Sequence, residues 1–68
     1  MINGELLKNK IFERGYTIEN FSDALNVRKN IFIMKINSNI EFTVGEVSKI
    51  SLLLRLNYNE IEDIFFST

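Results

Sequence analysis

The chain contains no cysteine and no histidine among its 68 residues. Without cysteine it has neither a disulfide nor a thiolate zinc site, and without histidine it lacks the usual general base and the imidazole metal ligand. These absences exclude most hydrolase and metalloenzyme mechanisms. We therefore expect a protein that is not an enzyme, with no catalytic residues, no metal site, no cofactor and no small-molecule substrate.

Proline is also absent, and glycine occurs only three times. The one stretch that could alternate as a strand is Ile31 to Ile36, so the pattern favours helices throughout. No apolar run approaches the roughly 20 residues that cross a bilayer, and the N-terminus lacks the residue order of a signal peptide. We expect a cytoplasmic protein without a membrane partner.

The composition is that of one small folded domain spanning residues 1–68. Hydrophobic residues make up 46% of the chain and charged residues 25%. A chain of this length buries only about 60% of its unfolded surface, so its large apolar side chains must share one core. The net charge of −1 is unevenly distributed: residues 28–40 carry three cations and no anion, and residues 56–68 carry three anions and no cation. The positive stretch is the candidate surface for a negatively charged partner.

Apolar spacing predicts two helices in the first third of the chain. One runs from Glu5 to Arg14 and ends at Gly15, and its i, i+4 pattern places three side chains inward: Leu7, Ile11 and Phe12. The second begins after the N-cap Thr17 and ends near Asn26, which tolerates the left-handed conformation of a tight turn.

Three more helices follow. The third covers about residues 28–36, with Phe32 and Ile36 facing inward. The fourth and fifth each begin with the sequence pattern of a capping box, formed by Thr43 and Glu46 and by Asn57 and Glu60. In the fifth helix we expect Ile64 and Phe65 to close the core and Phe66 to stay outside it. The sequence thus predicts an all-α, compact five-helix domain.

The order of turn and core positions resembles that of the lambda-repressor-like (Cro/repressor) helix-turn-helix regulators, in particular small phage regulators of low-GC Gram-positive hosts. The resemblance covers about Leu7 to Phe66 and is carried by Gly15-Tyr16-Thr17, Phe21, Ala24-Leu25-Asn26-Val27, Phe32, Lys35-Ile36-Asn37, Glu41-Phe42-Thr43, Glu46 and Ile50. It implies a lambda-repressor-like domain with a helix-turn-helix at about residues 17–36. The implied function is transcriptional control in a phage lysis–lysogeny circuit, in the cytoplasm of the host cell.

In such proteins the third helix enters the DNA major groove. Position by position, the resemblance implies that five residues face the groove: Arg28, Lys29, Asn30, Ile33 and Met34. It implies three phosphate contacts: Thr17, Asn37 and Asn39. With Phe32 and Ile36 inward, the helical rotation of 100° per residue independently turns Asn30, Met34 and Asn37 outward. Lys35 is a further cation that could reach phosphate. A homodimer on a pseudo-palindromic operator would follow.

The sequence departs from the resemblance at the helix that should read DNA. Arg28 stands where a serine or threonine cap is usual, and Ile31, Ile33 and Met34 stand where small or polar residues are usual. An apolar patch on a surface helix typically marks a protein contact. The alternative function is therefore a modulator that binds a partner repressor protein through four residues: Asn30, Ile31, Ile33 and Met34. Three simpler interpretations are open: Ile31 packs beside the second helix, the inward face of the third helix is shifted by one residue, or the basic cluster is only a solvated surface.

Overall fold

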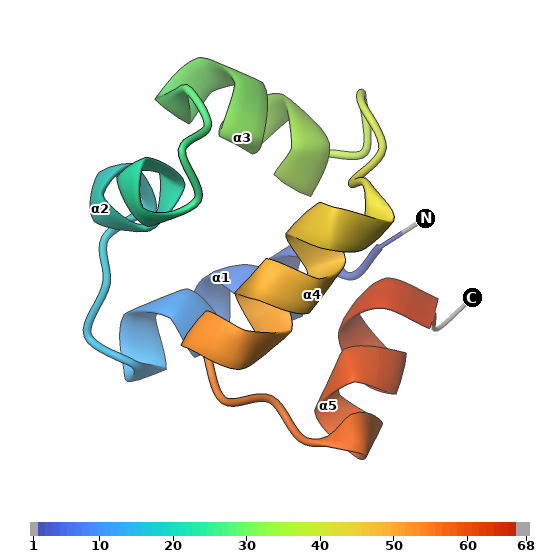
Figure 1. The fold of residues 1–68 in the computed structure, drawn as a ribbon. Helices are drawn as coiled ribbons and strands as arrows, with labels where there is room; N and C mark the ends of the chain where they lie inside the picture. Colours follow the sequence, from blue (N-terminus) through green and yellow to red (C-terminus); the bar gives the residue numbers. More distant parts are fainter. Residues whose placement is uncertain (1, 67–68) are drawn as a thin grey trace.

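The computed structural model describes residues 2–66, and every regular element in that range is helical. The elements are α1 Gly4–Glu13, α2 Ile18–Ala24, α3 Lys29–Ile36, α4 Val44–Leu53, α5 Tyr58–Ile61 and the π-helical turn η1 Glu62–Phe66, which continues α5. The predicted all-α fold is confirmed. In Figure 1, α2 and α3 form one end of the domain and α5 the other, with α1 and α4 between them. The start of α1 and the end of η1 lie on the same side of the domain, where the Asn3 N–H donates to the Ile64 carbonyl at 2.7 Å.

Side-chain caps fix where most of these helices begin. Both predicted capping boxes are present: Thr43 and Glu46 exchange side-chain to backbone hydrogen bonds at the start of α4, and Asn57 and Glu60 do so at the start of α5. Asn3 and Thr17 cap α1 and α2 in the simpler way, each accepting one backbone N–H. Each such cap stabilises a helix start by about 1 kcal/mol because it satisfies an otherwise unpaired amide. The start of α3 differs, since Arg28 makes no capping hydrogen bond.

The first four helices all end in one motif, a Schellman turn. In each, the N–H of the second residue after the C-cap donates to a carbonyl five residues earlier, through the pairs Tyr16–Ile11, Val27–Ser22, Asn39–Met34 and Leu56–Ser51. The residue between has a positive φ of 87° at Gly15, 60° at Asn26, 66° at Ser38 and 54° at Arg55. The turns at Gly15 and Asn26 match the prediction. The positive φ at Arg55 was not predicted, because arginine carries no signal for the left-handed conformation.

The core is formed by ten buried apolar residues, which come from α1 to α4, their C-terminal ends and η1: Leu7, Ile11, Phe21, Leu25, Phe32, Ile36, Ile50, Leu54, Ile64 and Phe65. Phe32 and Ile36 face inward as predicted, and Phe66 lies outside. The inward prediction for Phe12 is wrong, because its side chain is 54% exposed. Phe12 lies about 100° around the helix from the fully buried Ile11, and this rotation carries its ring out of the inner face.

Five aromatic rings contact one another in chain order through this core. The ring centroids of Tyr16 and Phe21 lie 5.0 Å apart, those of Phe21 and Phe32 lie 5.8 Å apart, those of Phe32 and Phe42 lie 6.0 Å apart, and those of Phe42 and Phe65 lie 5.8 Å apart. We call this series the aromatic row. Phe32 is its middle ring and attaches α3 to α2 on one side and to the α3–α4 loop on the other.

A close backbone approach fixes the other end of α3. A Cβ atom added at Gly4 would lie 2.5 Å from the Ile36 carbonyl oxygen, so only glycine lets the start of α1 lie against the end of α3. The aromatic row and this contact together set the orientation of α3 on the rest of the domain.

The Phe32→Ala substitution should lower the free energy of unfolding by about 3 to 5 kcal/mol, since it leaves a cavity in the middle of the aromatic row. Phe12→Ala is the matched control and should cost much less, because that ring is already more than half exposed. Urea denaturation followed by far-UV circular dichroism measures both values. If Phe32→Ala does not fold, Phe32→Leu should fold with a smaller loss. A Phe32→Ala variant as stable as the wild type would contradict the inward position.

Candidate functional site

The candidate site is built on α2 and α3, which are joined by residues 25–28. The turn begins with the Schellman motif at Asn26 and ends at Arg28, whose extended backbone precedes the first turn of α3. The Phe21 and Phe32 rings, both fully buried, pack the two helices together. The two helices pack in this way because each buries one aromatic side chain in the core, and because the turn that joins them is too short to let them separate.

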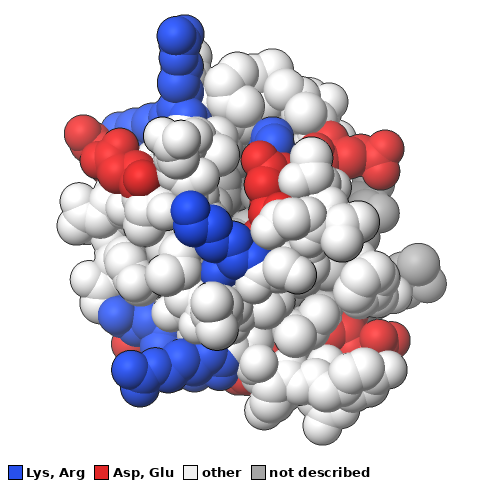
Figure 2. Space-filling view, in the orientation of Figure 1, with Lys and Arg blue, Asp and Glu red and all other residues white. Residues whose placement is uncertain are grey.

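The structure places the predicted groove-facing residues on one exposed side of α3 and its start. Arg28, Lys29 and Asn30 are exposed, while Ile33 is 39% and Met34 is 40% exposed. Figure 2 shows Lys and Arg side chains gathered at the start of α3, at the top left, and mostly uncharged surface over the rest of the helix. The site is therefore basic at its N-terminal end and apolar at its centre.

The other predicted contacts surround this surface. Thr17, Asn37 and Asn39 are all exposed, at the start of α2 and just beyond the end of α3. The Thr17 hydroxyl accepts the Asn20 N–H at 3.0 Å, so its oxygen caps α2 and its proton remains available as a donor. Ile31 is half-buried and less exposed than Ile33 and Met34. It therefore contributes less to the exposed surface than the sequence analysis expected.

Lys35 does not join the basic surface. Its side chain is buried, with its Nζ 2.6 Å from both carboxylate oxygens of Glu46 and 5.9 Å from the centroid of the Phe42 ring. The expectation that Lys35 could reach phosphate is wrong for this conformation. Its charge is compensated by a partner eleven residues away on α4, and the ion pair holds the end of α3 against the start of α4. Of the three cations in residues 28–40, Arg28 and Lys29 remain on the surface.

Lys29 also has an acidic neighbour, although a weak one. Its Nζ lies 3.9 Å from Glu19 Oε1, and both side chains are more than half exposed. Exposed pairs at this distance contribute little, typically less than about 1 kcal/mol, and phosphate can compete for the lysine. Lys29 is thus available to a polyanion in a way that Lys35 is not.

Asn30 partly replaces the missing cap of α3. Its Oδ1 accepts the N–H of the next residue, Ile31, at 3.0 Å, whereas the Arg28 side chain makes no capping bond. The Asn30 NH₂ group remains a donor, but the two-bond pairing with adenine needs the oxygen as well. The amide oxygen has two lone pairs, so the Oδ1 that accepts the Ile31 N–H still has one for the N6–H of an adenine.

The two capping-box glutamates each hold a lysine from another helix. Burial alone would raise the pKa of Glu46, but the hydrogen bonds from Lys35 and from the Thr43 N–H, with the Lys35 charge, outweigh it and hold that pKa below its usual value. The pKa of Glu60 is also lowered, first by its hydrogen bond from Lys10 and then by the Asn57 N–H. Lys10 Nζ lies 2.8 Å from Glu60 Oε2. These ion pairs tie α3 to α4 and α1 to α5.

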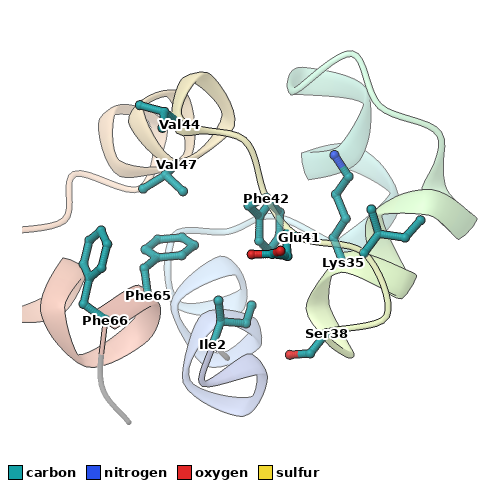
Figure 3. A pocket seen from close by; sticks show the side chains of 10 residues that line it. Ile2, Lys35, Ser38, Glu41, Phe42, Val44, Val47, Phe65 and Phe66 are labelled. Carbon is teal, nitrogen blue, oxygen red and sulfur yellow. The ribbon is translucent and has the colours of Figure 1, made fainter.

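A groove that the sequence analysis did not identify lies beside the end of α3. It has a volume of about 540 Å³ and is bounded by the α3–α4 loop, α4, η1 and the N-terminal residues. Figure 3 shows Ile2, Phe42 and Phe65 lining its inner part, with Val44 and Phe66 at its edge. Val44 is 85% and Phe66 is 61% exposed. The exposed Phe66 was the available sign of this groove, but residues so far apart in the sequence gave no reason to group them.

Residues 2–66 bring together no group of three or more side chains of the types that hold a metal ion. Within the same range, each helix is too short or too polar to cross a membrane. Comparisons with protein-family models and with curated proteins found no match to the chain.

Acid should weaken the fold through the two paired glutamates. A carboxylate whose pKa is lower in the folded state stabilises the fold above its unfolded pKa of about 4.3, and this stabilisation is lost as the pH falls through the folded value. We expect the free energy of unfolding to fall steeply below about pH 4.5 and the fall to be shallower in Glu46→Gln. Glu41→Gln removes an exposed carboxylate of the neighbouring loop and should keep the wild-type curve. Urea titrations across this pH range measure the difference, and parallel curves for wild type and Glu46→Gln would contradict the role of the pair.

Proposed function

We propose that this protein is a small, non-enzymatic transcriptional regulator that binds operator DNA through α3. The observation that carries the proposal is the division of α3 into two sides. Phe32, Lys35 and Ile36 are buried against the domain, and Lys29, Asn30, Ile33 and Met34 form one exposed side. A helix with side chains is about 10 to 12 Å wide, which matches the roughly 12 Å major groove.

The exposed groups supply the contacts such binding needs. Arg28 and Lys29 carry the positive charge that attracts phosphate, and either can pair with guanine. Thr17, Asn37 and Asn39 provide neutral hydrogen-bonding groups for phosphate at the two edges of the surface. Asn30 pairs with adenine through its NH₂ group and the second lone pair of its Oδ1. In this proposal the protein acts in the cytoplasm of a bacterial host, in a phage lysis–lysogeny circuit, and represses by blocking access of the polymerase.

The size of the domain favours binding as a pair. Its longest dimension is 26 Å, which is shorter than the roughly 34 Å of one DNA turn that separates the half-sites of a palindromic operator. One copy therefore covers a single half-site, and a homodimer places one α3 in each of two successive major grooves. Two copies also double the small number of phosphate contacts that each surface offers.

A second function is favoured by the apolar centre of the same surface. Ile33 and Met34 are each about 40% exposed next to the half-buried Ile31, and the ion pair to Glu46 removes Lys35 from the available charge. An exposed apolar surface with few cations suits a protein contact better than a phosphate backbone. In this alternative the protein binds a partner repressor through Asn30, Ile31, Ile33 and Met34 and modulates its activity.

Salt dependence tests the DNA proposal. With Arg28 and Lys29 as the main phosphate ligands, a dimer should neutralise about four phosphates and give a log–log salt slope of about −3.6. Lys29→Ala should reduce the slope to about half this value, whereas Lys49→Ala removes an equal charge from the exposed surface of α4 and should leave the slope unchanged. Fluorescence anisotropy with DNA from the flanks of the protein's own gene measures these slopes. Absence of binding at low salt to any flanking sequence would count against the DNA proposal.

Serine substitutions at the apolar centre separate the two functions. Ile33→Ser and Met34→Ser should leave the melting temperature nearly unchanged, because both side chains are already partly exposed. If Ile33 and Met34 anchor a protein interface, each substitution should weaken binding to the partner repressor by about 1 to 3 kcal/mol. If they contact base edges, each should instead relax operator specificity and leave partner affinity intact. Isothermal titration with a candidate partner, any regulator encoded beside the gene, together with the anisotropy assay, gives both affinities. A melting temperature lowered by several degrees would show that these side chains belong to the core.

A further inference from the structure

We infer that the operator carries thymines at the centre of each half-site and that Ile33 and Met34 recognise their 5-methyl groups. This inference rests on the proposed DNA function and deepens it, because it names the base chemistry that α3 selects. It starts from an imbalance on the exposed side of α3, where the centre of the surface carries apolar side chains in place of hydrogen-bonding ones.

The exposed residues of α3 form two short columns along the helix. Lys29 is followed four residues later by Ile33, and Asn30 four residues later by Met34, so in each column a polar side chain lies one turn before an apolar one. All four are exposed. The polar pair lies at the N-terminal end beside Arg28, and the apolar pair lies about 6 Å further along the helix axis. A groove-bound α3 therefore presents hydrogen-bonding groups at one end and hydrocarbon at its centre.

The chemistry of the major groove leaves one good match for that hydrocarbon. Guanine, cytosine and adenine present hydrogen-bonding donors or acceptors there, and thymine alone adds an apolar group, its 5-methyl. Against isoleucine or methionine, the polar edge of another base would lose its water without gaining a partner, which is unfavourable. Thymine loses less and gains buried apolar contact. The preference follows both from attraction to the methyl group and from exclusion of the other bases.

The polar residues of α3 do not compete with this assignment. Lys35 is bound to Glu46 on the buried side of the helix. Arg28, Lys29 and Asn30 lie at the N-terminal end, where they can pair with bases of their own. One turn further along the helix, the exposed side presents only Ile33 and Met34, so we expect their chemistry to decide the base at the centre of the half-site.

The experiment starts from random-sequence duplexes from which the wild-type protein selects its preferred site. In the selected duplex, each thymine is then replaced in turn by deoxyuridine, which removes only the 5-methyl group. Fluorescence anisotropy gives the Kd of each duplex for the wild type, for Ile33→Ala and Met34→Ala, and for Lys29→Ala. Circular dichroism checks that each variant is folded, as expected from the partial exposure of all three side chains.

We expect deoxyuridine at one or two central positions to weaken wild-type binding by about three- to fivefold per methyl group, the loss that corresponds to one buried carbon. For the position that Ile33 or Met34 contacts, the Kd of the corresponding alanine variant should be the same with thymine as with deoxyuridine. Lys29→Ala should bind every duplex more weakly but keep the full effect of deoxyuridine, which separates methyl recognition from general affinity.

Two results would overturn the inference while leaving DNA binding intact: a selected site without central thymines, or wild-type affinity that does not change with deoxyuridine at any position. A sensitivity to deoxyuridine that persists unchanged in both alanine variants would overturn the assignment to Ile33 and Met34. If selection enriches no sequence at all, the proposed DNA function fails, and this inference fails with it.

Discussion

The fold depends on the contacts of Phe32, the middle ring of the aromatic row. Its ring lies 5.8 Å from that of Phe21 and 6.0 Å from that of Phe42, and its side chain is fully buried. In a 68-residue chain without disulfides, packing of large side chains in the core is the main means of holding a short helix in place. Aromatic contacts bury large areas and prefer specific ring arrangements. Phe32 therefore contributes to stability and also decides how α3 is rotated on the domain.

That rotation determines which residues are available for recognition. With Phe32 and Ile36 inward, Lys35 is carried toward α4, where Glu46 compensates its charge. The same rotation leaves Lys29, Asn30, Ile33 and Met34 outside. The residual surface is weakly basic and partly apolar: its cations support the proposed DNA function, and its apolar side chains support the proposed protein contact. The two functions depend on different groups of the same surface: DNA binding on Arg28 and Lys29, and protein binding on Ile33 and Met34.

Local signals predicted most of the helix boundaries. Thr43 with Glu46 and Asn57 with Glu60 define helix starts because the hydrogen bonds involved span only three residues, and Gly15 defines a helix end because its backbone conformation is a property of the residue itself. The inward position of Phe32 and Ile36 follows from helical periodicity.

What could not be predicted depends on contacts between distant residues. Lysine is usually a surface residue, so nothing in the sequence indicated that Lys35 is buried. Only the packing of α3 against α4 brings its side chain to Glu46. The groove beside η1 joins residues from both ends of the chain, such as Ile2 and Phe65. For Phe12, periodicity gave an inner face wider than the one the helix buries.

The repeated Schellman turns have a consequence for how such a domain changes over time. The four turns share one backbone geometry, yet the residues that adopt the left-handed conformation are a glycine, an asparagine, a serine and an arginine. One turn geometry is compatible with four residue types because the hydrogen bonds of the turn come from the backbone, and a side chain at the left-handed position adds only a local cost of about 1 to 2 kcal/mol. We therefore expect the residue at such a turn to vary more easily than the turn itself. Two chains can keep the same succession of helices while their sequences diverge at the very positions where the helices stop.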